Sequence, residues 1–405
     1  MRRALALVRP YADVALRPTG ARLIAAAFAV DFAFVLVFIV ALQSLLRHQY
    51  LGGHYLPALA LSGYAAGKLT LQAPAGRLVD WMGARGAAMT AVSAVLVAQA
   101  LLAFGETQPL LLLACAFAYG GASPCFWPAA YDGVNRSFGP EQRALMTSAL
   151  SAATGAGMAA ALVVGALLPD SFPLAGALAV ACGGAVLSLP LVAGIPAGKL
   201  PPARRRPGGV AASSRVVSAA AVMLAQSAAV AALVAVFRAF GAEALRITFR
   251  TEVIALAGPA AATGAGVLAA GLAGQRLPRG AVLAPAFLVA GTALLVLGGA
   301  TSALLALGAS TVAAFGLGLG IPTTTALVLD VARGAGAGRV FGIVLTFEGL
   351  GHVAGPLIAG LVGDAGHAVQ AAGCMLLFAV AVSALVFLDA RSNPAVEVGL
   401  AGEAP

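Results

Sequence analysis

Apolar residues in this chain of 405 residues run in long stretches, separated by short segments that hold most of the charged residues. A helix needs roughly 20 apolar residues to cross a hydrocarbon core of about 30 Å. Twelve stretches have about this length, and we expect each to be a membrane-spanning helix: Leu23–Leu46, Leu56–Ala75, Ala87–Phe104, Pro109–Ala130, Ala144–Leu168, Phe172–Ile195, Val217–Phe237, Val253–Leu272, Ala281–Gly299, Leu304–Leu327, Val340–Gly363 and Ala368–Leu388.

The segment PAGKLPPARRRPGGVAASSR separates the sixth and seventh stretches and is rich in Pro, Gly and Arg, which is typical of a linker. It predicts two six-helix halves, 1–195 and 217–405, joined by a linker at 196–216. The halves also repeat, because GRLVDWMGARG from Gly76 and GLAGQRLPRGA from Gly271 are 195 residues apart, as are Gly165 and Gly360. Two parallel copies indicate a pseudo-twofold axis along the membrane normal, a design of secondary transporters. We therefore expect an all-α membrane protein.

Charged residues make up only 10% of the chain, whereas about 25% is usual in soluble domains, so a soluble fold is excluded. The basic residues that give the net charge of +9 are distributed unevenly between the two sides of the predicted spans. All but five of the 24 Lys and Arg residues lie on one side of the predicted spans; Arg47, Arg238, Arg246 and Arg250 lie on the other side, and Lys68 lies within a span. Basic residues concentrate on the cytoplasmic side. We expect a multi-pass protein of a bacterial-type inner membrane with both termini cytoplasmic, and no nucleic-acid partner.

The four cysteines stand in apolar runs without the spacing of a metal site, and we expect small buried residues rather than ligands or disulfides: Cys115, Cys125, Cys182 and Cys374. No metal or cofactor is expected. The first twenty residues lack a clean apolar core and cleavage site, so we expect the first span to be an uncleaved anchor.

Three ionisable residues, Asp31, Lys68 and Glu348, lie deep within predicted spans. Each costs about 2.5–3.5 kcal/mol at a helix centre, so a partner or a water-filled cavity is expected. Each is eight residues from the predicted cytoplasmic edge, a depth of about 12 Å. Lys68 can pair with Asp31 or with Glu348. The pair is either a static link between helices or part of an ion and substrate path, and we favour the path.

Neighbouring residues extend this candidate site. His352 lies one helical turn beyond Glu348, where it either relays protons or is a satisfied hydrogen-bonding group. Gln226 lies 195 residues after Asp31, at the equivalent depth of the other half, which predicts a shared substrate cavity. Phe34 and Phe38 follow Asp31 at helical spacing, and they, with Tyr119, either line that cavity or only pack.

The segment GRLVDWMGAR resembles the signature loop between the second and third helices of the major facilitator superfamily, commonly G-x-L-x-D-[RK]-x-G-R-[RK]. The matching residues are Gly76, Leu78, Asp80, Gly83 and the base Arg85, whereas Trp81 and Ala84 depart from the pattern. The resemblance covers essentially the whole chain and implies the twelve-helix fold of that family, similar to drug or metabolite:proton antiporters. In that fold the second helix packs beside the eleventh, and the first lines the cavity.

The loop is also interpretable physically. Its glycines permit a tight turn, and Asp80 at the cytoplasmic edge can face the positive end of a neighbouring helix and bases such as Arg77 or Arg339. We expect a cytoplasmic gate that is shut in one state and broken in the other. The alternative is that Arg77 and Arg85 only enforce topology.

The predicted function is secondary active transport by alternating access, namely proton-coupled efflux of a small organic or amphipathic molecule by a monomer in the lipid bilayer. The alternative within this class is proton-coupled uptake of a small organic anion on Lys68, because the antiporter glycine-proline signature of the fifth helix is degraded in GAGMAAALVVGALL. A membrane-embedded enzyme or a non-transporting receptor is the alternative from another class. The sequence holds no G-x-x-x-x-G-K-[ST], HExxH or GxSxG pattern.

Overall fold

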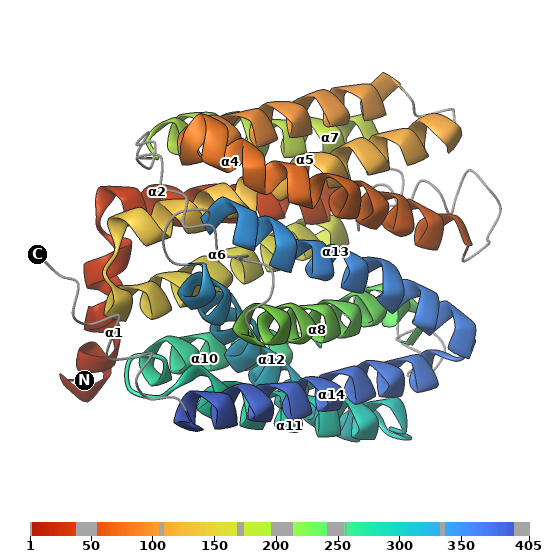
Figure 1. Ribbon diagram of the computed structural model, residues 1–405. Helices are drawn as coiled ribbons and strands as arrows, with labels where there is room; N and C mark the ends of the chain where they lie inside the picture. The colour runs from red at the N-terminus through yellow and green to blue at the C-terminus, as the bar shows by residue number, and fades with distance from the viewer. Residues whose placement is uncertain are drawn as a thin grey trace, which may run out of the picture.

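The computed structural model describes residues 2–37, 55–104, 109–167, 174–195, 214–240, 255, 257–332 and 337–392, and every regular element in these ranges is a helix (Figure 1). The helices are α1 (Arg2–Ala15), α2 (Pro18–Phe34), α4 (Tyr55–Phe104), α5 (Pro109–Ser137), α6 (Pro140–Leu167), α7 (Leu174–Ala193), α8 (Ser214–Ala239), α10 (Ala257–Ala273), α11 (Arg279–Gly298), α12 (Ala303–Val331), α13 (Ala337–Val362) and α14 (Ala365–Ser392).

Each of the twelve predicted spans overlaps one of these helices, and the second and third both fall within α4. Eight stretches in the described part of the chain are long and apolar enough to cross a membrane, and α7 and α10 contribute shorter apolar helices. The chain is therefore a multi-pass, all-helical membrane protein.

The predicted loop between the second and third spans is a sharp break inside α4. Gly83 has φ 77° and ψ 166°, a conformation that is essentially restricted to glycine. The two arms of α4 on either side of this residue run in opposite directions beside α5 (Figure 1). Gly83 is therefore where the chain reverses, as the loop pattern predicts.

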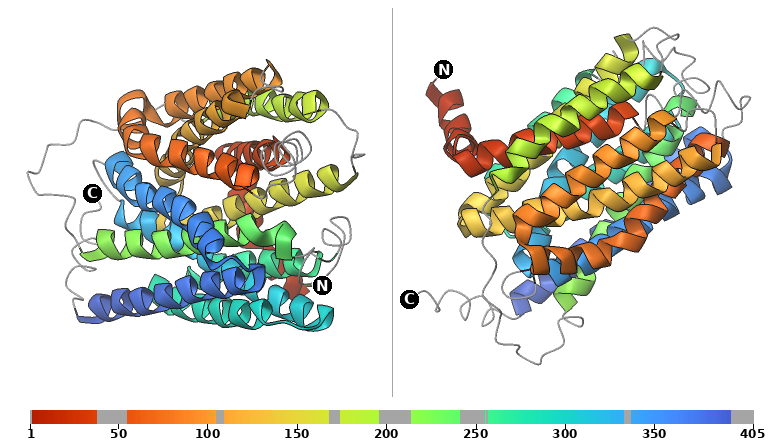
Figure 2. Two further views of the ribbon diagram at one scale, coloured as in Figure 1. Left: turned by 90° about the vertical axis from the view of Figure 1, so that its right-hand side faces the viewer. Right: turned by 90° about the horizontal axis from the view of Figure 1, so that it is seen from above.

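Helix α1 was not anticipated from the sequence. It lies at an angle to the long helices, at the end of the bundle where α2 begins (Figure 2). Tyr11 and Val14 bury their side chains there, with 8% and 2% of their surfaces exposed. We refer to this end of the bundle, where α10 and α12 also end, as the α1 end.

The same packing relations occur in both parts of the chain. The pairs α2–α6, α2–α7, α4–α5 and α4–α7 correspond to α8–α13, α8–α14, α10–α12 and α11–α14. Between the two parts, α4 packs against α13 and α6 packs against α10, which again correspond. The proposed boundaries at 1–195, 196–216 and 217–405 stay a prediction, because most of the linker lies outside the described residues.

Candidate transport site

A cavity of about 380 Å³ lies between the two parts of the bundle. Residues of α2, α4, α5, α6, α7, α8, α10, α12 and α13 line it. The predicted residues Asp31, Phe34, Lys68, Tyr119, Gln226, Glu348 and His352 are all among them. Phe38 lies outside the described residues.

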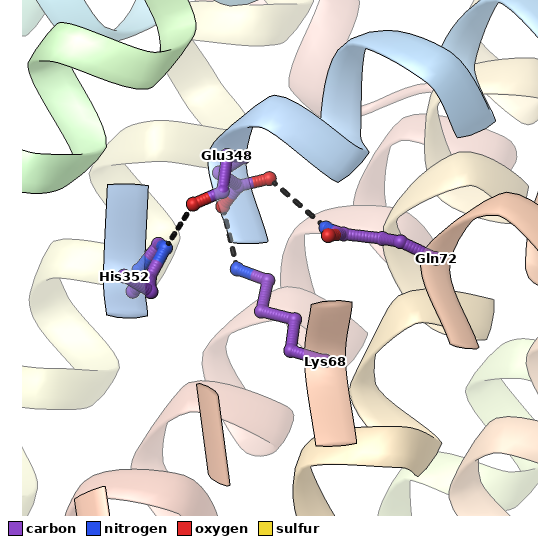
Figure 3. Close-up of polar contacts among 4 residues, drawn as sticks. All are labelled: Lys68, Gln72, Glu348 and His352. Carbon is purple, nitrogen blue, oxygen red and sulfur yellow. Dashed lines mark hydrogen bonds and ion pairs between the residues drawn. The ribbon is translucent and has the colours of Figure 1, made fainter. Parts of the chain in front are cut away.

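Lys68 pairs with Glu348, one of the two partners that its depth allowed. The Lys68 Nζ atom lies 2.6 Å from Glu348 Oε1, and only 7% and 21% of the two side chains are exposed. Figure 3 shows the pair at the meeting of α4 and α13. The salt bridge therefore links the two parts of the bundle.

Gln72 is a second partner of Glu348 that the sequence analysis missed. Its Nε2 donates to Glu348 Oε2 over 3.4 Å, and it lies one helical turn after Lys68 on the same helix (Figure 3). Its four-residue spacing from Lys68 was the available signal. Two donors from α4 thus hold both oxygens of one carboxylate of α13.

His352 contacts the main chain of Glu348 rather than its carboxylate. The Nδ1 atom lies 2.8 Å from the Glu348 carbonyl oxygen (Figure 3). Because a carbonyl oxygen only accepts, Nδ1 carries the hydrogen in this contact. In this arrangement Nδ1 has a hydrogen-bond partner, and whether His352 also relays protons stays a prediction.

Asp31 differs from Glu348 in that no described lysine or arginine forms a salt bridge with its carboxylate. Asp31 lines the cavity, and the Thr154 hydroxyl of α6 lies beside its carboxylate. The Gln226 Oε1 atom on α8 is buried without a partner among the described residues. Asp31, Thr154 and Gln226 therefore bring polar groups from three helices to the cavity wall.

Aromatic rings form much of the wall on the α2–α5 side. Phe34 lies 4.9 Å from Tyr64 and 5.9 Å from Tyr119, measured between ring centroids. Nearer the α1 end, Tyr131 lies 5.6 Å from Trp127 and 5.9 Å from Phe341 of α13. Tyr64, Trp127 and Tyr131 line the cavity but were not predicted, because isolated aromatics in apolar runs look like packing residues.

The predicted gate residues lie at the α1 end. Gly76 is buried, Asp80 and Arg85 are exposed, and the side chain of Arg339 in α13 is outside the described part. Close by, Arg136 Nε contacts Asp132 Oδ2 over 2.7 Å. Burial raises the pKa of the Asp132 carboxyl, Arg136 lowers it, and the charge of Asp80 raises it. Asp80 therefore lies within electrostatic reach of the end of α5.

One expectation for the cysteines is wrong. Cys115 is buried, as predicted, and Cys125 and Cys182 are partly buried, but Cys374 on α14 is exposed. An apolar run in a spanning helix also supplies the outer face of the bundle, so hydropathy does not separate the two environments.

The fold has close counterparts among solved structures. The human organic anion transporter MFSD10 (TETRAN) superposes with a TM-score of 0.75 at 14% identity, over 91% of this chain and 99% of that one. A variant of the E. coli fucose:proton symporter FucP gives 0.71 at 15% identity, over 92% and 99%. FucP in an outward conformation gives 0.69 at 14% identity, over 91% and 99%.

Two sequence comparisons bear on the family. Residues 23–216 match the family model described as the Major Facilitator Superfamily. The comparison with curated proteins finds no match. The family match over residues 23–216, together with the fold, points to a membrane transporter rather than an enzyme. The chain thus resembles the Major Facilitator Superfamily in sequence over its N-terminal half and in fold over most of its length.

Proposed function

We propose that the chain is a proton-coupled exporter of small organic or amphipathic molecules. The observation that carries the proposal is the Lys68–Glu348 salt bridge, which crosses between the two parts of the bundle beside the carboxylate of Asp31. Protonation of Glu348 removes its attraction for Lys68, and Lys68 is then free to pair with Asp31. Because Glu348 and Asp31 belong to different halves, this exchange couples proton binding to their relative movement.

The α1 end is cytoplasmic in this proposal, and both termini lie on that side of the inner membrane. The support is the charge distribution, because basic residues such as Arg17, Arg77, Arg85, Arg136 and Arg279 lie at this end among the described residues. The transporter works as a monomer, since the cavity is complete within one chain.

A second candidate is uptake of a small organic anion on Lys68. It is favoured by the fold that this chain shares with the organic anion transporter MFSD10. Against it, Lys68 is already neutralised by Glu348. The two functions differ in direction, so loss of the gene raises sensitivity to a toxic compound in the first case and reduces uptake of a nutrient anion in the second.

The experiment that tests the proposal is a compound screen in proteoliposomes that reports the internal pH. A substrate that is exchanged for protons acidifies or alkalinises the lumen when it is added, and empty liposomes provide the baseline. Substrate flux without any coupled pH change contradicts proton coupling.

The signature loop is proposed to gate the cytoplasmic side. We expect Asp80→Asn to leave the protein folded and inserted but to lower turnover severalfold, because it removes the charge without changing the volume. Transport rate per inserted molecule is the measurement, and Asp13→Asn, an exposed aspartate of α1, is the matched control. Unchanged turnover in Asp80→Asn means that the loop serves topology alone.

A further inference from the structure

The positive and negative charges of the residues that line the cavity do not sum to zero. Lys68 and Glu348 form one pair at 2.6 Å and neutralise each other. Asp31 lines the same cavity beside the neutral hydroxyl of Thr154, and no described lysine or arginine forms a salt bridge with it. Since Lys68 is the one lysine or arginine among the described lining residues, an ionised Asp31 leaves the cavity with an uncompensated negative charge.

Aromatic rings stand next to this charge. Phe34 follows Asp31 by three residues on α2, so the two side chains leave the helix from the same face. Phe34 is in turn in contact with Tyr64 and Tyr119, which also line the cavity. Aromatic faces attract cations, most strongly where water is excluded.

The opposite wall offers space and little charge. The described lining residues from α8, α10 and α12 are small, aliphatic, amide or hydroxyl side chains, for example Val230, Ala231, Thr263 and Gly318. Such a wall accommodates an apolar body without imposing a charge of its own.

We infer that the cavity binds an organic monocation, with its positive charge against Asp31 and the rings of Phe34, Tyr64 and Tyr119, and its apolar body against α8, α10 and α12. The inference rests on the proposed transport function and deepens it by assigning the charge class of the substrate. It opposes the anion candidate, because an organic anion would meet the Asp31 carboxylate, which no lysine or arginine of the described residues neutralises.

The test is equilibrium binding, which requires neither a gradient nor transport. The sequence holds two tryptophans, Trp81 and Trp127, and Trp127 lines the cavity. In a Trp81→Phe background, Trp127 fluorescence therefore reports occupancy. The probes are benzyltrimethylammonium and benzenesulfonate, which share one ring and carry opposite charges.

We expect benzyltrimethylammonium to bind at least tenfold more tightly than benzenesulfonate, and Asp31→Asn to reduce its affinity at least tenfold. Asp364→Asn, an exposed aspartate at the start of α14, is the matched control and leaves the affinity unchanged. Equal or tighter binding of the anion, no binding of the cation, or full affinity in Asp31→Asn overturns the inference. Cation binding without any transport would instead contradict the proposed function alone.

A second inference comes from α1 and its contact with α10. The Tyr11 hydroxyl donates to the Leu268 carbonyl oxygen over 2.6 Å, although Tyr11 precedes α2 and Leu268 lies on α10. A β-carbon at Gly271 would collide with that hydroxyl and with Ser148 of α6. Tyr11 is therefore inserted where α6 and α10 meet.

The contact of Tyr11 lies at the second copy of the signature loop, which lacks the aspartate of the first copy. The loop after α10 is the second copy of the signature loop, and Gln275 stands 195 residues after Asp80. The second copy thus has no carboxylate at the gating position, and α1 covers the glycine with which that copy begins.

We propose that α1 is a strap that holds α6 and α10 together and stabilises the state in which the α1 end is closed. Tyr11 contacts both Leu268 of α10 and the neighbourhood of Ser148 of α6, so a separation of α6 from α10 would break the bond from Tyr11 to Leu268. The strap therefore sets how often the transporter opens on this side.

The test places a single cysteine, Thr147→Cys, in a cysteine-free protein, because Thr147 is buried and lines the cavity near the α1 end. Its reaction rate with a membrane-impermeant maleimide is measured in vesicles that expose the α1 end. Tyr11→Phe removes one hydrogen bond, and we expect the rate to rise about fivefold. Gly271→Ala displaces the hydroxyl from the opposite side, and we expect the same direction of change.

Leu16→Ala is the matched control, since Leu16 also belongs to the α1 connection but is 80% exposed. Its labelling rate stays at the parent value. Parent rates in both Tyr11→Phe and Gly271→Ala, or an equal rise in Leu16→Ala, overturn the strap.

Discussion

At the scale of single residues, Lys68 and Glu348 form a largely buried ion pair in which each charge depends on the other. Removing one member of a buried pair leaves the other charge uncompensated, whereas removing both is often close to neutral. Lys68 and Glu348 are mostly removed from solvent, and Gln72 can satisfy only part of the carboxylate.

We therefore expect Lys68→Ala to destabilise the protein by about 3 kcal/mol, and the double variant Lys68→Ala/Glu348→Ala to be more stable than Lys68→Ala alone. Thermal unfolding of the purified variants measures both. A double variant that is less stable than either single variant shows that the two residues act independently.

The sequence predicted that Asp31, Lys68 and Glu348 lie within spanning helices, but not how they pair, and it did not predict that Asp132 is buried. Spacing along a helix fixes depth, and Asp31, Lys68 and Glu348 share one depth, so both partners of Lys68 stayed open. Which of the two acids pairs with Lys68 depends on the rotation and packing of α4 against α13, and these are tertiary properties. Tyr131 and Trp127 were missed for the same reason, because a ring that lines a cavity and one that fills a core have the same sequence context.

At the scale of elements, the break in α4 is the feature that the sequence predicts most clearly. The glycines of GRLVDWMGARG predicted a turn, and Gly83 provides it with a conformation that other residues avoid. Helix α1 is the contrary case, since its interrupted apolar pattern signalled neither a span nor a packed helix, and its burial depends on contacts with α6 and α10.

We expect Gly83→Ala to destabilise the protein by about 1–3 kcal/mol, the cost of forcing a side chain into that region of φ/ψ space. Gly360→Ala is the control, because Gly360 is helical and a β-carbon there meets no atom within 4 Å. Alanine there has the higher helix propensity, so stability is unchanged or rises by up to about 1 kcal/mol. Unfolding temperatures of the two variants provide the comparison, and equal values contradict the strained turn.

At the scale of the whole molecule, two similar sets of helices enclose one cavity, and the charged residues within it are divided between them. Asp31 and Lys68 come from the first set and Glu348 from the second. The apolar runs and the 195-residue offset predicted this architecture because bilayer thickness and the cost of unpaired backbone groups restrict the alternatives. They do not predict the charge of the cavity, which in our inference determines the charge class of the substrate.

The central claim is that protonation of the cavity carboxylates drives the transport cycle. Counterflow and proton-gradient-driven flux of one substrate, measured side by side in proteoliposomes, test it most directly. The account predicts that Asp31→Asn and Glu348→Gln abolish concentrative, gradient-driven flux, while counterflow exchange, measured at a substrate concentration that saturates each variant, stays largely intact. If both neutralised variants still concentrate substrate against its gradient, these carboxylates are structural and the account of coupling is wrong.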